Sequence, residues 1–289
     1  MISIEHIIKS KLKVLIKDKY LTDAHRHSFY DINKVLNMEN LSVEEWITNP
    51  NYIKFDKKTK SLRGNLLADY IKDWLEFSYD ENIRTIIDFS AKRAREDLQL
   101  IYSSYDIKSF SPLKWTDLSN ITKYNIPEFI MLPDERELTD SILVKVKAII
   151  EKFPTIKLTM HCLESKFRKD LAMKKFSMST IEFLDKYNIL NNKLFLVHIN
   201  EVTKVDIELI RRNHVKIILC PLIRDAFNYK TPSIPHQNLD IYFGTDIPLI
   251  SKNRSLIDVA VKQIIIWIQN GVKLEDALKS AEKALVNTI

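Results

Sequence analysis

Residues 194–220 read LFLVHINEVTKVDIELIRRNHVKIILC, in which two apolar runs flank one amphipathic stretch. The run Leu194–Val197 is short and apolar, and Val215–Leu219 has no polar alternation, as is typical of strands buried on both faces. Between them, Val205–Asn213 has the apolar spacing of a helix. We therefore predict a strand–helix–strand unit with two parallel strands.

The same alternation continues along the rest of the chain. Six further strands are predicted at Tyr20–Ala24, Thr85–Phe89, Ile107–Phe110, Phe129–Leu132, Ile156–Met160 and Leu239–Phe243. Further helical patterns cover Leu66–Phe77, Ala91–Tyr102, Asp140–Phe153, Ala172–Tyr187, Leu256–Asn270 and Leu274–Val286. Eight parallel strands with intervening helices can close into a barrel, although residues 110–129 show no clear helix. We expect residues 1–289 to form one α/β domain, a (β/α)8 TIM barrel.

The composition excludes several classes of protein. Only three glycines are present, so no glycine-rich phosphate loop can be built, and nucleotide sites of that type are excluded. Two cysteines provide no disulfide framework, which fits a reducing compartment. The N-terminus lacks the pattern of a signal peptide, and no apolar run approaches the ~20 residues of a membrane span. We therefore expect a cytoplasmic protein with no membrane partner.

The formal net charge of +6 permits two interpretations. It can attract anionic partners such as nucleic acid, or it can reflect a lysine-rich surface that keeps the protein in solution. The densest basic cluster, Lys57, Lys58 and Lys60, has no interleaved aromatic residues. We favour the second interpretation and expect no nucleic-acid partner.

Two histidines stand two positions apart at the end of the first predicted strand, in the run DAHRH of residues 23–27. Residues two apart on a strand share one face, so His25 and His27 can point together into the mouth of a barrel. Neutral imidazoles in that arrangement chelate a divalent transition metal. Two unrelated histidines at a strand end are common, so this pair alone does not decide the question.

Three more residues of ligand type follow predicted strands. His161 comes directly after the run KLTM, and His198 comes directly after the run LFLV. Asp246 comes two residues after the run IYFG, which ends the last predicted strand. In a barrel the carboxyl ends of all strands lie at one rim, where the active sites of this fold are found. Four of the seven histidines and one aspartate would then meet there. We therefore predict a metal site at this rim and rank a purely structural role second.

Glu164 lies three residues after His161, where the chain leaves the predicted strand. A carboxylate in that place can shuttle a proton to or from a metal-activated water. A solvated loop glutamate is the alternative interpretation. The position beside His161 favours the catalytic one.

The ordered series DAHRH, HCLES, LVHINEV, CP and GTDIP resembles the amidohydrolase superfamily. Within it, the series is most similar to the deaminase and chlorohydrolase branch, which includes guanine, cytosine and S-adenosylhomocysteine deaminases. The resemblance extends from about residue 20 to residue 270. The five-part order is far more specific than the pair of histidines alone.

The resemblance implies one divalent metal ion, zinc first and iron as the alternative, held by His25, His27, His161 and Asp246. It implies that Glu164 protonates a ring nitrogen of the substrate and shuttles a proton to the leaving ammonia. His198 would contact the attacking water or the substrate, and Asp246 would also take a proton from the water. No lysine follows the strands where a carbamylated bridging ligand would be needed, so a second metal is not expected.

Two features depart from this branch. Its members usually carry a small β-sandwich built from both chain ends, whereas here about 20 residues precede the first predicted strand, so we expect the sandwich to be missing. After Cys220-Pro221 the chain continues with LIR instead of the Ser-Asn of many deaminases. The substrate therefore stays open.

We expect hydrolytic deamination of an amino-substituted nitrogen heterocycle of purine, pyrimidine or triazine type. Hydrolysis of a cyclic amide or a carbon–halogen bond at the same site is the first alternative, and a catalytically silent barrel that binds a ligand is the second. The expected partner is a small heterocyclic substrate, and a homo-oligomer is compatible with a missing sandwich.

Two arginines and one insert complete the candidates. Arg224 and Arg254 follow the seventh and eighth predicted strands and could clamp an anionic group of the substrate, although solvated loop arginines are the commoner case. The polar insert of residues 28–65 follows the first strand and could act as a substrate lid.

Overall fold

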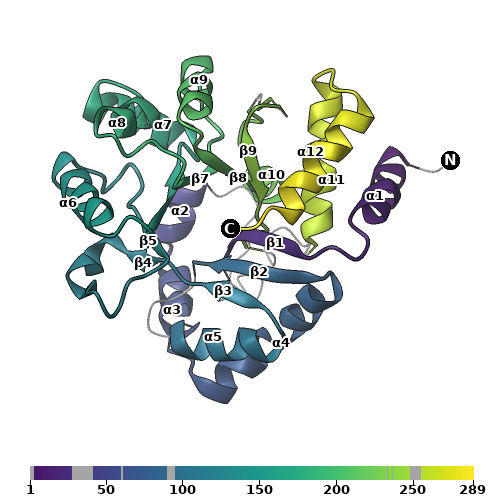
Figure 1. The fold of residues 1–289 in the computed structure, drawn as a ribbon, viewed down its shortest axis with the longest axis horizontal. Coiled ribbons are helices and arrows are strands. Elements are labelled where there is room, and N and C mark those ends of the chain that lie inside the picture. Colours follow the sequence, from purple (N-terminus) through teal and green to yellow (C-terminus); the bar gives the residue numbers. More distant parts are fainter. Residues whose placement is uncertain are drawn as a thin grey trace. The chain divides into compact units, whose positions relative to one another are not determined.

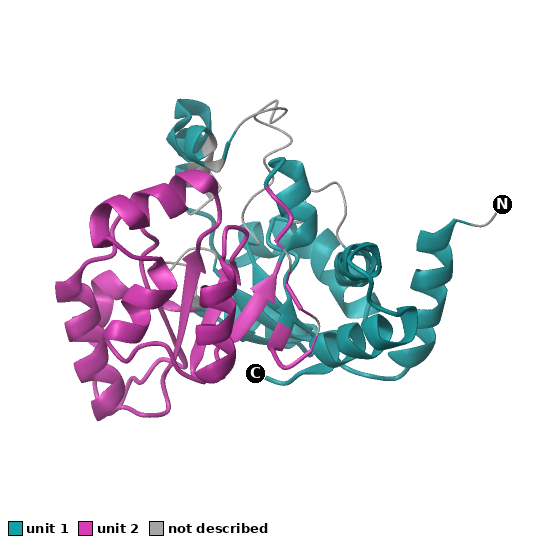
Figure 2. Ribbon diagram, turned by 90° about the horizontal axis from the view of Figure 1, so that it is seen from above, with its two compact units in different colours: residues 1–111, 220–229, 242–289 teal, residues 112–219, 230–241 magenta. Residues whose placement is uncertain are grey.

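The computed structural model of the chain describes residues 3–27, 42–59, 61–89, 95–232, 234–235, 237–247 and 255–289. Figure 1 shows the chain as a ribbon coloured along the sequence, and Figure 2 shows the two compact units into which it divides. Unit 1 comprises residues 1–111, 220–229 and 242–289, and unit 2 comprises residues 112–219 and 230–241. That residues 1–289 form a single domain stays a prediction.

Unit 1 contains a three-stranded parallel sheet in the order β1-β2-β3. Its strands are β1 (Leu21–Arg26), β2 (Ile83–Asp88) and β3 (Lys108–Phe110). All six residues of β1 are buried, including its charged ones. A strand buried on both faces needs partners for such charges.

Helices surround this sheet in unit 1 (Figure 1). The helix α4 packs on β2, α5 packs on β3, and α1, α11 and α12 pack against one another. Nine of the residues of α11 are buried, as expected for a helix that is apolar around most of its circumference. The helices of unit 1 are α1 (Ile4–Leu15), α2 (Val43–Thr48), α3 (Pro50–Thr59), α4 (Gly64–Asp80), α5 (Arg95–Ser104), α10 (Pro221–Ala226), α11 (Leu256–Gln269) and α12 (Leu274–Val286).

The second sheet has six strands in the order β4-β5-β6-β7-β8-β9, and it belongs to unit 2 except for the last two residues of β9. The ladders from β4 to β8 are all parallel. In the register of β6 and β7, His161 lies opposite Val197 and Cys162 lies opposite His198. The strands are β4 (Leu113–Lys114), β5 (Phe129–Met131), β6 (Lys157–Cys162), β7 (Leu194–His198), β8 (Lys216–Leu219) and β9 (Asp240–Phe243).

The helices of unit 2 are η3 (Trp115–Asn120), α6 (Asp140–Lys152), α7 (Lys166–Phe176), α8 (Thr180–Lys186) and α9 (Lys204–Arg212). The prediction of a single helix at Ala172–Tyr187 is wrong, because α7 ends at Phe176 and a separate helix, α8, begins at Thr180. Ser177 takes the left-handed conformation with φ 56°, and Ser179 then caps α8 by accepting a bond from the Glu182 N–H. Two serines that favour capping and turns therefore divide one apolar pattern into two helices.

The α/β fold with parallel strands is confirmed. All eight predicted strands are present, and the structure adds the short strand β4 and the 3-10 helix η3 where no helix was predicted. Among the described residues the ladders form two separate sheets, and the ladders from β1 to β3 and from β4 to β8 are parallel. The described residues before β1 and after β9 contain helices and no strand. None of the helices in the described ranges has the length and apolarity that a membrane crossing requires.

Candidate functional site

In unit 1, three predicted ligands converge where β1 ends. The Asp246 N–H donates to the His25 carbonyl at 2.8 Å, and the His27 N–H donates to the Asp246 carbonyl at 2.7 Å. These bonds hold the segment after β9 beside the end of β1 in a parallel bridge. The Asp246 Oδ1 atom then lies 3.6 Å from His25 Nε2 and 3.7 Å from His27 Nε2. The two imidazole nitrogens and the carboxylate oxygen are therefore close enough to bind one ion together.

This donor set fits a divalent transition metal. In a tetrahedral zinc site with ligand distances of about 2.0–2.1 Å, neighbouring ligand atoms are about 3.3 Å apart. The observed separations exceed this by a few tenths of an ångström. The His25 ring is fully buried and packs edge-on against Phe89 with ring centroids 4.2 Å apart, so its direction is constrained.

Gly244 permits the close approach of the two segments. A Cβ atom added at this position would lie 2.7 Å from the Cβ of His25 and 2.9 Å from its carbonyl oxygen. It would also lie 3.1 Å from the Sγ of Cys220. Real Cβ atoms do not approach backbone so closely, so a side chain at Gly244 would push Asp246 and β1 apart.

A buried ion pair inside β1 supports the same region. Arg26 Nε lies 3.1 Å from Asp23 Oδ2, and both side chains are completely buried. The Thr245 hydroxyl and N–H both donate to Asp23, and Arg26 also donates to Thr245 Oγ1 at 3.1 Å. The Arg26 guanidinium lies over the ring of Trp74 at 4.5 Å. Burial raises the pKa of Asp23 above its ordinary value of 3.8, and the charge of Arg26 opposes that rise.

In unit 2, the other predicted residues gather at the ends of β6 and β7. The rings of His161 and His198 have centroids 5.5 Å apart. Glu164 Oε1 lies 3.8 Å from His198 Nε2, and both side chains are buried. His198 has φ 73° and Leu163 has φ 48°, in the left-handed region that residues other than glycine rarely adopt. Surrounding contacts must hold such backbone in place.

Beside Glu164 lies a network of charges that was not predicted from the sequence, in which Arg168 and Glu135 are buried and Asp134 is half-buried. Arg168 Nη1 lies 2.8 Å from Asp134 Oδ1 and 3.8 Å from the Oε2 of Glu135. Burial alone would raise the pKa of Asp134, but the hydrogen bond from Arg136 and the charge of Arg168 outweigh it and hold that pKa below 3.8. Burial raises the pKa of Glu135 above 4.5, against the hydrogen bond that it accepts from the Leu163 N–H.

The supporting residues missed in the sequence left a detectable signal. Asp23 and Arg26 are charged residues within a strand whose six residues are all buried, and Glu135 follows the apolar run of β5 after three residues. A charge in a strand buried on both faces requires a partner. The partner itself depends on long-range contacts and cannot be identified from such a pattern.

The remaining candidates have mixed outcomes. Arg224 is buried, and its Nη2 donates to Asp225 Oδ1 at 2.7 Å, so its role towards a substrate stays a prediction. Arg254 and residues 28–41 of the insert lie outside the described residues. The described remainder of the insert contains α2 and α3, and its role as a lid also stays a prediction.

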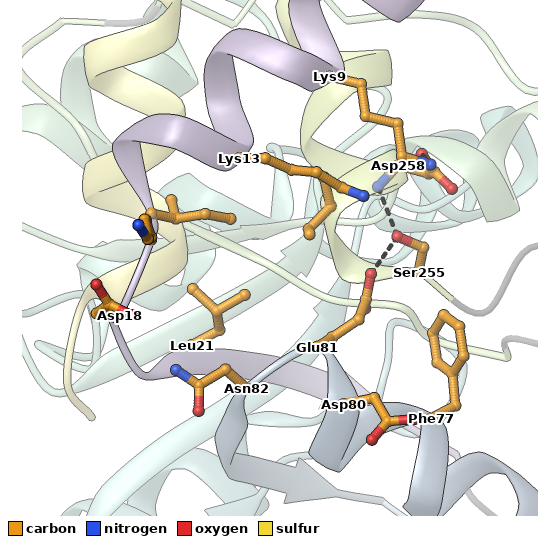
Figure 3. A pocket seen from close by; sticks show the side chains of 13 residues that line it. Lys9, Lys13, Asp18, Leu21, Phe77, Asp80, Glu81, Asn82, Ser255 and Asp258 are labelled. Carbon is orange, nitrogen blue, oxygen red and sulfur yellow. Dashed lines mark hydrogen bonds and ion pairs between the residues drawn. The ribbon is translucent and has the colours of Figure 1, made fainter.

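One pocket of about 680 Å³ lies in unit 1, at the opposite end of β1 from His27 (Figure 3). Leu21 lines it, so along the strand it is about 13 Å from His25 and about 20 Å from His27. Glu81 in its wall accepts a hydrogen bond from the Ser255 hydroxyl and another, at 2.8 Å, from the Leu256 N–H. Burial raises the pKa of Glu81 above 4.5, and these bonds oppose the rise. Glu81 therefore anchors the start of α11. None of the predicted metal ligands lines this pocket.

Comparison with known sequences gives one distant relative. No protein-family model matches the chain. An uncharacterised protein of Methanocaldococcus jannaschii is 24% identical over 239 residues, which cover 78% of this chain and 62% of that protein. The chain thus spans about three fifths of the length of this relative.

Comparison with solved structures identifies the fold. An adenosine deaminase from Xanthomonas campestris with bound zinc matches 92% of this chain and 66% of its own, with a TM-score of 0.75 and 11% identity. A guanine deaminase from C. acetobutylicum with bound guanine matches 93% of this chain and 74% of its own, with a TM-score of 0.71 and 14% identity. A triazine hydrolase from Arthrobacter aurescens matches 81% of this chain and 60% of its own, with a TM-score of 0.68 and 12% identity. The fold is therefore that of these TIM-barrel hydrolases, and the resemblance seen in the sequence is confirmed at the level of the fold.

Proposed function

We propose that this protein is a metal-dependent hydrolase whose metal is held by His25, His27, His161 and Asp246. The observation that carries the proposal is the convergence of two imidazole nitrogens on Asp246 Oδ1, at 3.6 and 3.7 Å within unit 1. A histidine pair with one carboxylate is a ligand set typical of catalytic zinc sites, with iron as the alternative.

His161 is proposed as the fourth ligand because of its place in the fold. It lies near the carboxyl end of β6, as His25 lies near the carboxyl end of β1. In TIM-barrel enzymes the carboxyl ends of the strands form the rim that carries the active site. His161 would complete the set from that rim.

The finer proposal is hydrolytic deamination of an amino-substituted nitrogen heterocycle. A bound divalent ion supplies the Lewis acidity that makes water nucleophilic near neutral pH. Glu164, which is buried and 3.8 Å from His198, would give its proton to the ring nitrogen of the substrate. It would then take a second proton, from the hydroxyl group that the attacking water leaves on the ring carbon, and deliver that proton to the leaving ammonia. His198 Nε2 steadies the attacking water or the developing charge on the substrate, and Asp246 accepts a proton from the water.

Removal of a halide is a second candidate, because triazine hydrolases are among the proteins of this fold. It needs the same activated water but releases chloride instead of ammonia. Incubation with aminopurines, aminopyrimidines and amino- or chlorotriazines, with ammonia and chloride measured in parallel, separates the two. We also propose that the protein acts in the cytoplasm, on a small heterocyclic substrate, with a homo-oligomer as a further expectation.

The first test is elemental analysis of the purified protein. Wild type is expected to contain about one equivalent of zinc or iron, and His25→Ala and His161→Ala are expected to lose it. His6→Ala is the matched control, because His6 is exposed on α1, and it should keep the metal. A wild type that stays free of metal after incubation with zinc and with iron would contradict the proposal.

The second test concerns Glu164. The variant Glu164→Gln keeps the size of the side chain but cannot deliver a proton, so turnover should be abolished while the metal stays bound. Unchanged turnover in this variant would show that Glu164 has no part in proton transfer.

A further inference from the structure

Glu164 is carried on a short turn between β6 and α7 in unit 2. The turn begins at Leu163, whose φ of 48° is costly for a residue with a branched side chain. A conformation of this kind persists only where surrounding contacts hold it in place. The position of the Glu164 carboxylate therefore depends on whatever binds the turn.

Glu135 provides a specific contact to this turn. Its Oε1 atom accepts a hydrogen bond from the Leu163 N–H at 2.8 Å and another from the Thr180 hydroxyl at 3.0 Å. The Glu135 side chain is completely buried, so its carboxyl group faces the protein and not the solvent. Burying such a group is costly, and here the carboxyl group accepts from the backbone amide at the start of the turn.

Glu135 is itself fixed from two sides. Lys175 Nζ donates to the Glu135 carbonyl at 3.3 Å. Arg168, held by Asp134 at 2.8 Å, lies 3.8 Å from Glu135 Oε2. The acceptor for the Leu163 amide thus has a defined position.

The far side of the turn is bound by residues that follow β7. The Asn200 side-chain amide donates to the Glu164 carbonyl at 2.9 Å, and the Glu201 N–H donates to the Leu163 carbonyl at 3.0 Å. With both sides held, Glu164 Oε1 lies 3.8 Å from His198 Nε2. Rigid support of this kind is what a proton-transfer group requires, because small displacements lower rates strongly.

We propose that Glu135 is the positioning residue for Glu164: its bond to the Leu163 amide sets the turn that directs the Glu164 carboxylate towards His198. The proposal rests on the proposed function of Glu164 in proton transfer. It assigns to Glu135 no contact with substrate or metal.

The test compares two variants of similar size, Glu135→Gln and Glu135→Met. The glutamine keeps an oxygen acceptor for the Leu163 N–H, whereas the methionine does not. In Glu135→Met, hydrogen exchange of the Leu163 amide should become about 10-fold faster or more, because a buried donor loses its acceptor. The kcat should fall about 10- to 100-fold, with KM changed less and metal content unchanged. Glu135→Gln should retain slow exchange and most of the kcat.

Two further variants keep the test decisive if Glu135→Met does not fold. Glu135→Asp keeps the charge but withdraws the acceptor by one methylene, so it should resemble the methionine variant in Leu163 exchange and kcat. Thr180→Val removes the other bond to Glu135 Oε1 and leaves the Leu163 bond in place. It should unfold at a lower urea concentration without a matching loss of kcat.

Crystal structures of Glu135→Gln and Glu135→Met separate this proposal from the proposed function. Glu164 should keep its 3.8 Å distance to His198 in the first and leave it in the second. If Glu164 moves only in Glu135→Met but the wild type shows no hydrolase activity, the positioning role of Glu135 is supported and the proposed hydrolase function is contradicted. An unchanged Leu163 turn and Glu164 position in Glu135→Met, or equal losses in both variants, would overturn the positioning role.

Discussion

The end of β1 in unit 1 and the turn after β6 in unit 2 hold their functional side chains by different means. In unit 1 the supporting charges, Asp23 and Arg26, are neighbours of the ligands on the same strand. In unit 2 the support comes from Glu135, which is 28 residues away from the Leu163 amide that it binds. A change in the first region should therefore damage strand and site together, whereas a change in the second should separate stability from activity.

The largest effect is expected for Arg26→Met. The methionine leaves Asp23 as a buried charge without its partner, which typically costs about 3–5 kcal/mol. Urea unfolding measures the loss, and zinc titration should show weaker binding as β1 loses order. The double variant Asp23→Leu with Arg26→Met should recover part of the stability, because it removes both charges. If the single variant loses less than about 1 kcal/mol, the ion pair does not support β1.

A smaller but more local effect is expected for Gly244→Ala. The new Cβ would lie 2.7 Å from the Cβ of His25, and relief of such overlap costs about 1–3 kcal/mol. Metal affinity should fall as well, since Asp246 is displaced from both histidines. The matched control is Gly271→Ala, which has φ 86° and open space around it, so it should cost about 1 kcal/mol and leave metal binding unchanged. Equal metal affinity in the two variants would remove the role assigned to Gly244.

The contributions of Asp134 in unit 2 and Glu81 in unit 1 to stability should depend on pH with opposite sign. The pKa of Asp134 is lowered from 3.8, so its ionised form stabilises the fold above pH 3.8 and this contribution is lost as the pH falls below that value. Asp134→Asn should cost about 1.5–3 kcal/mol at pH 7, and the difference from wild type should shrink below pH 3.8.

Glu81 should behave in the opposite way. Its pKa is raised from 4.5, so the folded state binds its proton more tightly and wild type loses stability as the pH rises above 4.5. Glu81→Gln should lack this loss. Urea unfolding at several pH values between 3 and 7 checks both variants, and parallel curves for wild type and Glu81→Gln would contradict the assignment.

The smallest effect is expected for Thr203→Ala. Thr203 caps α9 by accepting the Asp206 N–H, and loss of such a cap costs about 1 kcal/mol. Metal content and turnover should not change, because the cap is not part of either supporting network. A loss of turnover in this variant would show that modest destabilisation alone impairs the site, and it would weaken the inference from Glu135.

Most of the strands could be predicted from sequence, because each is a short apolar run without helical spacing. The division of one apolar pattern into α7 and α8 could not, since it depends on the caps that Ser177 and Ser179 form in three dimensions. The strand β4 has only two residues, too few for any pattern.

The candidate site divides in the same way. The sequence alone determined which side chains have the right chemistry, because His25, His27, His161, His198 and Asp246 all follow or end apolar strands. Only the tertiary structure decided that Gly244 lets Asp246 lie against β1, and that Glu135 binds the amide of Leu163. The physical reason is that the alternation of side chains along a strand depends only on neighbouring residues in the sequence. The partner of a buried charge or amide, in contrast, depends on how segments distant in the sequence pack together.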